Sequence, residues 1–256
     1  MDDATTGTLA QKEARRVKEQ LDPKDSLIVA LDFPSEDAAM ELVGRLEGCC
    51  RWFKVGMELY YAAGNSVIEG LRKRGYEVFL DLKLHDIPNT VAGAVRSVAG
   101  VGASLLTVHA GGGEPMMKAA VQAANLPGAP KLLAVTVLTS MDEAELRAVG
   151  VSDGPATQVL RLARLARAAG IGGLVCSPEE VEAVRQAMGP EMLLVVPGIR
   201  PRSAEERPDD QRRIATPAEA IARGASMLVV GRPITQAADP ARAALGILAE
   251  IATAHS

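Results

Sequence analysis

The sequence contains little cysteine, few aromatic residues and no cluster of positive charge. Of its three cysteines, Cys49 and Cys50 are adjacent and Cys176 is distant, a pattern that fits neither a disulfide framework nor a metal site, so we expect reduced, packed thiols. Aromatic residues make up 3% of the chain and do not recur at stacking spacing beside basic residues. Because the net charge is -4 and Lys and Arg are scattered, nucleic acid is not an expected partner.

Long hydrophobic runs are missing as well. No segment approaches the roughly 20 apolar residues of a transmembrane helix, so a membrane is not an expected partner either. Residues 1–25 are polar and charged and lack the apolar core of a secretion signal. We predict that they form an N-terminal extension, either a tail or an amphipathic helix over Leu9–Leu21, and that the protein is cytoplasmic.

Short apolar runs alternate with helical patterns from Ser26 onward. The eight runs that resemble strands are Leu27–Asp32, Trp52–Met57, Glu77–Leu84, Ser104–Ala110, Lys131–Leu138, Gly173–Cys176, Met192–Pro197 and Met227–Gly231. Eight strand–helix units in about 250 residues are typical of a TIM (β/α)8 barrel, so we predict a single α/β barrel domain over residues 26–256. The rival is a doubly wound open sheet, which would usually have a glycine-rich turn after its first strand, whereas Asp32–Ser35 contains no glycine.

Helical periodicity marks the segments between these runs. The predicted helices are Glu36–Leu46, Val91–Val101, Met116–Ala123, Thr157–Ala169, Pro178–Met188, Pro217–Arg223 and Pro240–Ala252. Ser35, Ser177 and Thr216 are predicted N-caps, because Ser and Thr hydroxyls accept hydrogen bonds from the first backbone N–H groups of a helix. Pro178 and Pro217 follow two of these caps at the first helical position, where proline is well tolerated.

Polar residues cluster at the carboxyl ends of the predicted strands, where barrels of this kind have their active sites. They are Asp32, Lys54, Asp81, Lys83, His109, Thr139, Ser177, Gly231 and Arg232. The run Tyr76–Leu84 is the most informative, because Phe79, Asp81 and Lys83 share one face of an extended strand and the alternate residues of the other face are apolar. Burying such charges costs on the order of several kcal/mol unless they are paired, which indicates a chemical role.

Asp32, Lys54, Asp81 and Lys83 are expected to meet at one barrel mouth, where their formal charges cancel. Because nearby carboxylates favour the protonated ammonium, we predict that Lys83 acts as a general acid. A Schiff-base lysine would need a desolvated site or a neighbouring cation. The alternative is an ionic plug that stabilises the barrel interior, although ion pairs stabilise poorly in comparison with apolar packing.

Two loops leave alternatives open. The glycine-rich segment Ala110–Gly113 fits a phosphate-binding nest, and it fits a tight turn into the next helix equally well. The polar segment Ile199–Ile214 is long for an unstructured connection, which favours a mobile lid over a solvated surface excursion.

The segment Asp81–Thr90 has the pattern Asp-x-Lys-x-x-Asp-Ile-Pro-Asn-Thr, which resembles the signature of the orotidine 5'-monophosphate decarboxylases of the bacterial type. The resemblance extends from Leu27 to about Ala249. Six further blocks carry it: Ala30–Asp32, Phe53–Gly56, Val135–Ser140, Pro197–Pro201, Asp210–Arg213 and Val230–Ile234. Several blocks in the expected order are far more specific than any one of them.

This resemblance implies decarboxylation of orotidine 5'-monophosphate to uridine 5'-monophosphate, the last step of de novo UMP biosynthesis, by a homodimer without metal or cofactor. The implied catalytic residues are Lys54, Asp81, Lys83, which protonates C6 of the pyrimidine, and Asp86, which acts in the partner subunit's site. The implied substrate-binding residues are Asp32 for the ribose, Ile87 and Thr90 from the partner, Thr139 and Pro197 for the base, and Arg200, Gln211, Gly231 and Arg232 for the phosphate.

The nearest rival is a magnesium-dependent decarboxylase or synthase that acts on sugar phosphates. Such enzymes share the Asp-x-Lys-x-x-Asp segment but have Glu where this chain has Lys54, and an ammonium cannot ligate magnesium. Zinc-dependent epimerase chemistry would use His85 and His109, neither of which has a partner at diagnostic spacing. The third alternative is a silent barrel that only binds nucleotide, and the complete set of charged residues argues against it.

Overall fold

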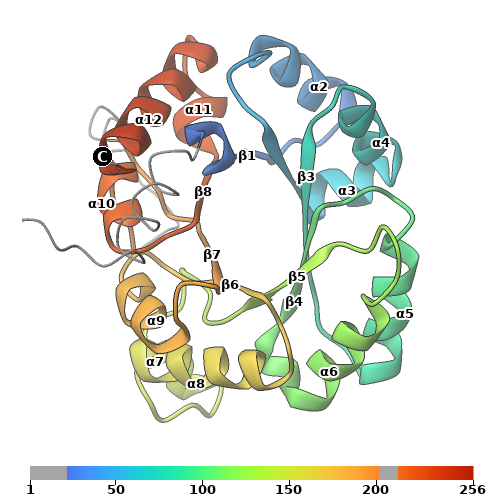
Figure 1. Cartoon of the computed structure of the whole chain (residues 1–256), viewed down its shortest axis with the longest axis vertical. Coiled ribbons are helices and arrows are strands. Elements are labelled where there is room, and N and C mark those ends of the chain that lie inside the picture. Colours follow the sequence, from blue (N-terminus) through green and yellow to red (C-terminus); the bar gives the residue numbers. More distant parts are fainter. Residues whose placement is uncertain (1–21, 202–212, 256) are drawn as a thin grey trace, which may run out of the picture.

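The computed structural model describes residues 22–201 and 213–255. Within them, eight parallel strands close into a barrel in sequence order, and helices surround it (Figure 1). The strands are β1 (Leu27–Leu31), β2 (Trp52–Gly56), β3 (Glu77–Leu84), β4 (Leu105–His109), β5 (Lys131–Val135), β6 (Gly173–Val175), β7 (Leu193–Val196) and β8 (Met227–Val230). Because β1 pairs with both β2 and β8, the predicted TIM barrel is confirmed and an open sheet is excluded.

Helices follow the strands on the outside of the barrel. They are α2 (Glu36–Arg45), α3 (Met57–Ala63), α4 (Ser66–Lys73), α5 (Pro88–Val98), α6 (Gly113–Ala123), α7 (Glu143–Ala148), α8 (Pro155–Ala168), α9 (Val181–Met188), α10 (Pro217–Ala222), α11 (Arg232–Thr235) and α12 (Pro240–His255), with 3-10 turns η1 (Pro23–Asp25) and η2 (Ala110–Gly112). Each helix that was predicted between or after the strands is present. The sequence patterns missed α3, α4, α7 and α11, which are only 4 to 8 residues long and so give little periodicity.

Two of the three predicted N-caps are confirmed. The Ser35 hydroxyl accepts a hydrogen bond from the Ala38 N–H, and Thr216 forms a capping box with Glu219. The prediction for Ser177 is wrong, because α9 begins at Val181. The Glu180 carboxylate accepts hydrogen bonds from the backbone N–H of Ser177, at 3.2 Å, and from its hydroxyl, so residues 178–180 form a turn before the helix.

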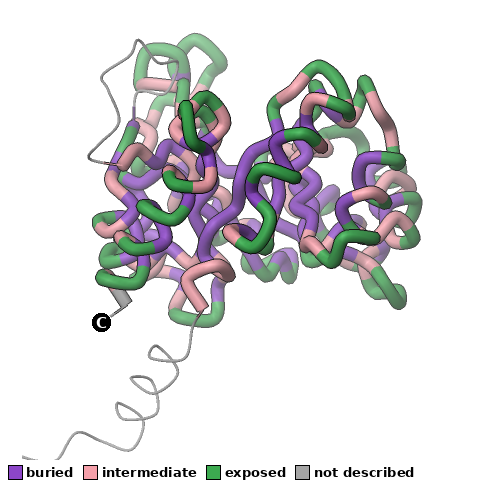
Figure 2. The backbone as a smooth tube through the Cα atoms, turned by 90° about the horizontal axis from the view of Figure 1, so that it is seen from above, coloured by how far each residue is buried: buried purple, intermediate pink, exposed green. Residues whose placement is uncertain are grey.

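The core has two parts, and Figure 2 shows buried residues concentrated along the strands. A smaller cluster fills the barrel, and its members come from alternate strand positions: Ile28, Ala30, Phe79, Leu105, Leu133, Val195, Met227 and Val229. The larger cluster lies between the strands and the helices and includes Val78 and Leu80 of β3. The predicted alternation along β3 is therefore confirmed: Phe79 faces the barrel interior, and its neighbours face the helices.

Two segments for which the sequence made predictions lie wholly or mostly outside the described residues. The predicted helix Leu9–Leu21 lies outside the described residues, as does most of the segment Ile199–Ile214. The two ends of that segment are joined, because Ile199 forms a parallel bridge with Ala215. Within residues 22–201 and 213–255, no helix combines the length and the apolar character that crossing a membrane requires.

Candidate active site

A cavity of ≈ 450 Å³ opens at the carboxyl ends of the strands. Its floor is apolar and includes Ala30 and Phe79 of the barrel interior. Its walls contain most of the predicted site residues, namely Asp32, Lys54, Asp81, Lys83, Thr139, Pro197, Arg200, Gly231 and Arg232. The volume and the mixture of apolar floor and converging polar groups are typical of a small-molecule site.

Four charged side chains alternate in sign across this cavity. The Lys54 ammonium lies 2.8 Å from Asp32 Oδ1 and 3.9 Å from Asp81 Oδ2, and the Lys83 ammonium lies 2.8 Å from the same Asp81 oxygen. Lys54 and Asp81 are mostly buried, with side-chain exposures of 11% and 13%, whereas Asp32 is 59% exposed. The predicted convergence of the four residues is confirmed, and their mutual pairing offsets the cost of burial.

Gly56 at the end of β2 permits the contact between Lys54 and Asp32. A Cβ atom at this position would lie 2.9 Å from Lys54 Nζ and 3.0 Å from Asp32 Oδ1, too close for either group to stay in place. Gly56 belongs to the family block Phe53–Gly56, but the sequence alone does not indicate this role. The two charged atoms meet over its backbone only because the strands are side by side in the barrel.

The backbone of β3 is irregular at Lys83. The pairing between β3 and β4 shifts register between Leu80 and Leu84, and Lys83 has φ 49°, the one positive φ of a non-glycine residue in the described chain. Such a conformation costs on the order of 1–3 kcal/mol, and outliers of this kind cluster at functional sites. The Lys83 N–H donates a hydrogen bond to the side chain of Thr107, a residue that the sequence analysis did not select.

Asp86, Ile87 and Thr90 do not line this cavity. They follow β3 and are exposed, and Ile87 retains 67% of its accessible surface. The Asp86 carboxylate accepts a hydrogen bond from the Ile87 N–H at 2.6 Å. Within a single chain, the structure therefore does not bring these three predicted residues to the four charged side chains of the cavity.

Three of the four residues predicted to bind phosphate line the cavity. Gly231 and Arg232 follow β8 and line the cavity, with Arg232 exposed. Arg200 follows β7, and its guanidinium donates a hydrogen bond to the Ile199 carbonyl at 2.9 Å. Gln211 lies outside the described residues.

The glycine-rich segment Ala110–Gly113 does not line the cavity. The turn η2 leads directly into α6, so the tight-turn interpretation of this segment is the one observed.

His85 and His109 lie outside the cavity wall, and Cys176, which lines the cavity, is not a reactive thiol. The rings of His85 and His109 stack with centroids 5.2 Å apart, outside the cavity wall. No group of three or more His, Cys, Asp or Glu side chains in the described part of the chain is placed to hold a metal ion. Burial, with a smaller contribution from Glu180, raises the pKa of the Cys176 thiol to about 12, so this cavity residue is neutral at pH 7 and is no thiolate nucleophile.

Comparison with known proteins gives a consistent result. The model of the orotidine 5'-phosphate decarboxylase / HUMPS family matches residues 25–247. The chain belongs to this family. It is 55% identical over 227 residues to the orotidine 5'-phosphate decarboxylase of Anaeromyxobacter dehalogenans, with 89% of this chain and 98% of that protein covered. The Nitrosococcus oceani enzyme of the same name is 51% identical over 229 residues, with 89% and 98% covered.

Solved structures agree with these sequence relatives. The crystal structure of orotidine 5'-phosphate decarboxylase from Lactobacillus acidophilus is similar to this chain with a TM-score of 0.78 and 41% identity, covering 89% of this chain and 99% of that one. The predicted resemblance to the decarboxylase family is thus confirmed. The charged array of this family member can place an ammonium beside a substrate atom that develops negative charge.

Proposed function

We propose that this chain decarboxylates orotidine 5'-monophosphate to uridine 5'-monophosphate and carbon dioxide, the last step of de novo UMP biosynthesis. The main support is the Lys83 ammonium, which lies at the cavity wall 2.8 Å from the Asp81 carboxylate. Relatives that are 50 to 55% identical over most of the chain carry the name of this enzyme. A cytoplasmic location stays a prediction from the sequence.

Placed charge is what this reaction requires. The bond between C6 and the carboxylate breaks, carbon dioxide leaves, and the electron pair remains on C6 in the plane of the ring. The Lys83 ammonium stabilises that pair and transfers a proton to C6, and the resulting amine regains a proton from water. Asp81 orients Lys83, and its repulsion of the substrate carboxylate disappears as carbon dioxide departs.

The remaining cavity residues are proposed to hold the rest of the nucleotide. Asp32 and Lys54 take the ribose hydroxyls, and Thr139 and Pro197 contact the pyrimidine. The 5'-phosphate is assigned to Arg232 and the backbone at Gly231, with Arg200 and Gln211 as further ligands. Binding energy from a phosphate remote from C6 can offset the cost of desolvating the reacting groups, which raises the rate of the chemical step.

A homodimer with shared sites is part of the proposal. Asp86 is exposed and lies outside its own cavity wall, as do Ile87 and Thr90, so the site needs a second copy to include them. Large apolar side chains are exposed on the same subunit at Ile87 (67%) and Tyr61 (77%), which suits an interface with a second copy.

Subunit mixing tests the shared site. Asp86→Ala and Lys83→Ala are each expected to be inactive alone, because each homodimer lacks one group in every site. Mixed subunits should regain part of the activity, since one site of each heterodimer then has both groups. Absence of recovery, after subunit exchange has been verified by mass spectrometry, would contradict the proposal.

The proposed reaction needs neither metal nor cofactor. The ammonium groups of Lys54 and Lys83 together already neutralise Asp32 and Asp81, the carboxylates that a magnesium ion would require. We therefore expect purified protein to consume orotidine 5'-monophosphate in excess EDTA, followed by loss of the orotate absorbance, with Lys83→Ala as the inactive control. No loss with EDTA, but turnover of a sugar phosphate with added magnesium, would favour the rival function.

A further inference from the structure

Thr107 is a fully buried threonine on β4 that the proposed mechanism does not use. Its hydroxyl lies between the two catalytic residues of β3. It accepts a hydrogen bond from the Lys83 backbone N–H at 2.8 Å and donates one to Asp81 Oδ1 at 2.9 Å. The direction of these bonds is determined, because an N–H can only donate and an ionised carboxylate can only accept.

We propose that Thr107 is a positioning residue for the decarboxylation, which sets the orientation of Asp81 and the backbone of Lys83. The inference rests on the proposed function. Thr107 does not line the cavity, so it acts through these two residues and not through contact with the substrate.

Thr107 holds the backbone of Lys83 in an unusual conformation. Between Leu80 and Leu84 the pairing of β3 with β4 is interrupted, so the strand ladder does not hold the backbone there. Lys83 has the left-handed conformation, with φ 49°, which L-residues rarely adopt without compensation. The Thr107 hydroxyl provides the acceptor for the Lys83 N–H in this conformation. It therefore stabilises the backbone geometry that directs the Lys83 ammonium to the cavity.

Thr107 also holds the carboxylate of Asp81. One of its carboxylate oxygens, Oδ2, faces the ammonium groups of Lys83 at 2.8 Å and Lys54 at 3.9 Å. The other oxygen, Oδ1, is held by Thr107. With both oxygens held, the carboxylate cannot rotate. Without the hydroxyl, Oδ1 would lose a partner at a mostly buried position. The Asp81 carboxylate could then rotate and would no longer fix the position of the Lys83 ammonium.

Thr107→Val tests the inference, because it removes the hydroxyl and preserves the shape of the side chain. We expect kcat to fall about 10- to 100-fold, the effect of losing a hydrogen bond to a charged group. KM and the affinity for uridine 5'-monophosphate should stay within about twofold, since the ribose, phosphate and base contacts are unchanged. Thr107→Ser keeps the hydroxyl and should restore most of kcat.

Thr136 provides a matched control. It is also a buried threonine, it directly follows the neighbouring strand β5, and its hydroxyl donates a hydrogen bond of 2.9 Å to the Val175 carbonyl. Thr136→Val thus removes an equivalent buried hydroxyl that touches no catalytic group. It should lower the thermal midpoint, although less than Thr107→Val does, because one hydrogen bond to a neutral carbonyl is lost, and it should leave kcat unchanged.

The outcomes separate the possible failures. If wild-type protein does not turn over orotidine 5'-monophosphate, the proposed function is wrong. If wild type is active and Thr107→Val keeps its kcat, or loses kcat only to the extent that Thr136→Val does, the positioning role is overturned. Should Thr107→Val not fold, Thr107→Ser and Thr107→Ala differ by the hydroxyl alone, and equal kcat values for these two variants would overturn the inference as well.

Discussion

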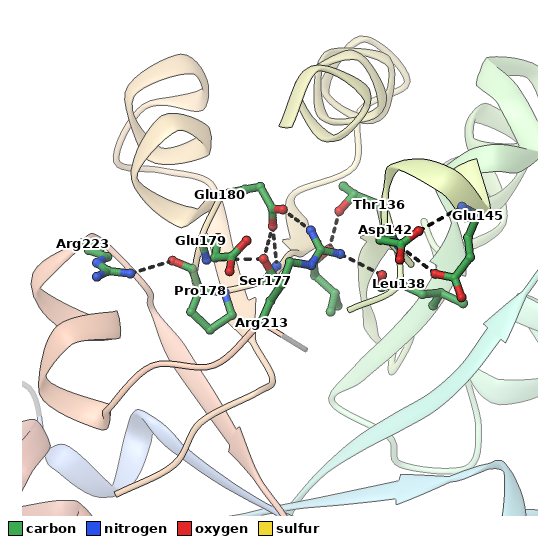
Figure 3. A network of polar contacts seen from close by, with 11 residues as sticks. Thr136, Leu138, Asp142, Glu145, Ser177, Pro178, Glu179, Glu180, Arg213 and Arg223 are labelled. Carbon is green, nitrogen blue, oxygen red and sulfur yellow. Dashed lines mark hydrogen bonds and ion pairs between the residues drawn. The ribbon is translucent and has the colours of Figure 1, made fainter. Parts of the chain in front are cut away.

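Two groups of charges in this barrel resemble each other in composition and differ in surroundings. The mouth cluster consists of Asp32, Lys54, Asp81 and Lys83 and borders the cavity. The second group is the ion pair between Glu180 and Arg213, whose residues are only 5% and 6% exposed (Figure 3). Both groups pair opposite charges, but only the mouth cluster faces space that a substrate can enter.

Other groups of the protein occupy most of the hydrogen-bonding positions of the buried ion pair. One terminal nitrogen of Arg213 donates to Glu180 and the other donates to the Leu138 carbonyl at 2.8 Å, while Glu180 also accepts from Ser177. Among the buried side-chain nitrogen and oxygen atoms of the described residues, only Nε of Arg213 has no hydrogen-bond partner. The contacts join the segments that follow β5 and β6 to the segment before α10. Paired charges that no substrate can reach therefore serve the fold, whereas paired charges that border the cavity can serve chemistry.

Replacing Lys83 should give the largest effect and should separate the two groups most clearly. Lys83→Ala removes both the stabilising charge and the proton donor, so we expect kcat to fall by at least about 10,000-fold. The free energy of unfolding should change by less than about 1 kcal/mol, since the side chain is partly exposed. Steady-state kinetics and urea unfolding measure the two quantities. If Lys83→Ala loses both activity and several kcal/mol of unfolding free energy, the mouth cluster stabilises the fold as well, and the distinction between the two groups of charges is wrong.

Arg213 should show the opposite behaviour. Arg213→Met leaves Glu180 as an unpaired buried charge, so we expect the free energy of unfolding to decrease by about 3–5 kcal/mol. Combining it with Glu180→Gln should recover most of this loss, because no unpaired charge remains and Ser177 keeps an acceptor. Urea unfolding of both variants measures the difference. If the double variant is as unstable as the single one, charge pairing is not what stabilises this region.

Arg232 tests whether an accessible charge outside the mouth cluster binds the phosphate. Arg232→Ala should raise KM on the order of 100-fold, the result of losing charge-assisted hydrogen bonds to the phosphate. Free guanidinium added to the assay should restore part of the activity of the variant and none of wild type. An unchanged KM would remove Arg232 from the proposed phosphate site.

The smallest expected effect concerns His109, which lies near the mouth cluster. Burial, followed by the positive charges of His85 and Lys83, lowers the pKa of His109 below its usual 6.5. Between this lowered pKa and 6.5 the unfolded chain binds more protons than the folded one, so this contribution to stability is complete above pH 6.5 and declines as the pH falls. Partial exposure and solvent screening limit it to about a few tenths of a kcal/mol.

Urea unfolding at pH 7.5 and pH 5.5 measures this contribution. The loss of unfolding free energy between the two pH values should be slightly smaller in His109→Gln than in wild type. An equal loss in both proteins would show that other groups carry the acid sensitivity.

Local sequence patterns predict much of this architecture. Alternation of apolar runs with helical segments predicted the barrel, and the opposite faces of β3 predicted that Asp81 and Lys83 would point to the cavity. These inferences succeed because side chains alternate along a strand and parallel strands of a barrel end at one face. The family blocks added Thr139, Pro197, Arg200, Gly231 and Arg232, which line the same cavity.

Local patterns failed where a feature depends on contacts between distant segments. Ser177 was mistaken for a helix cap because its partner Glu180 is engaged with Arg213, 33 positions later in the chain. Thr107 was overlooked because nothing in its apolar run shows that its hydroxyl faces Asp81, which is 26 positions away.

Composition, periodicity and motif order thus suffice for the fold class, the family and the identity of the charged residues, because each is encoded along the chain. The distances between those charges, the left-handed backbone of Lys83 and the close passage over Gly56 exist only once β1, β2, β3 and β4 are side by side. The same is true of the position of Asp86 outside its own cavity. Strand register and barrel closure determine these features, and both arise from the packing of the whole chain.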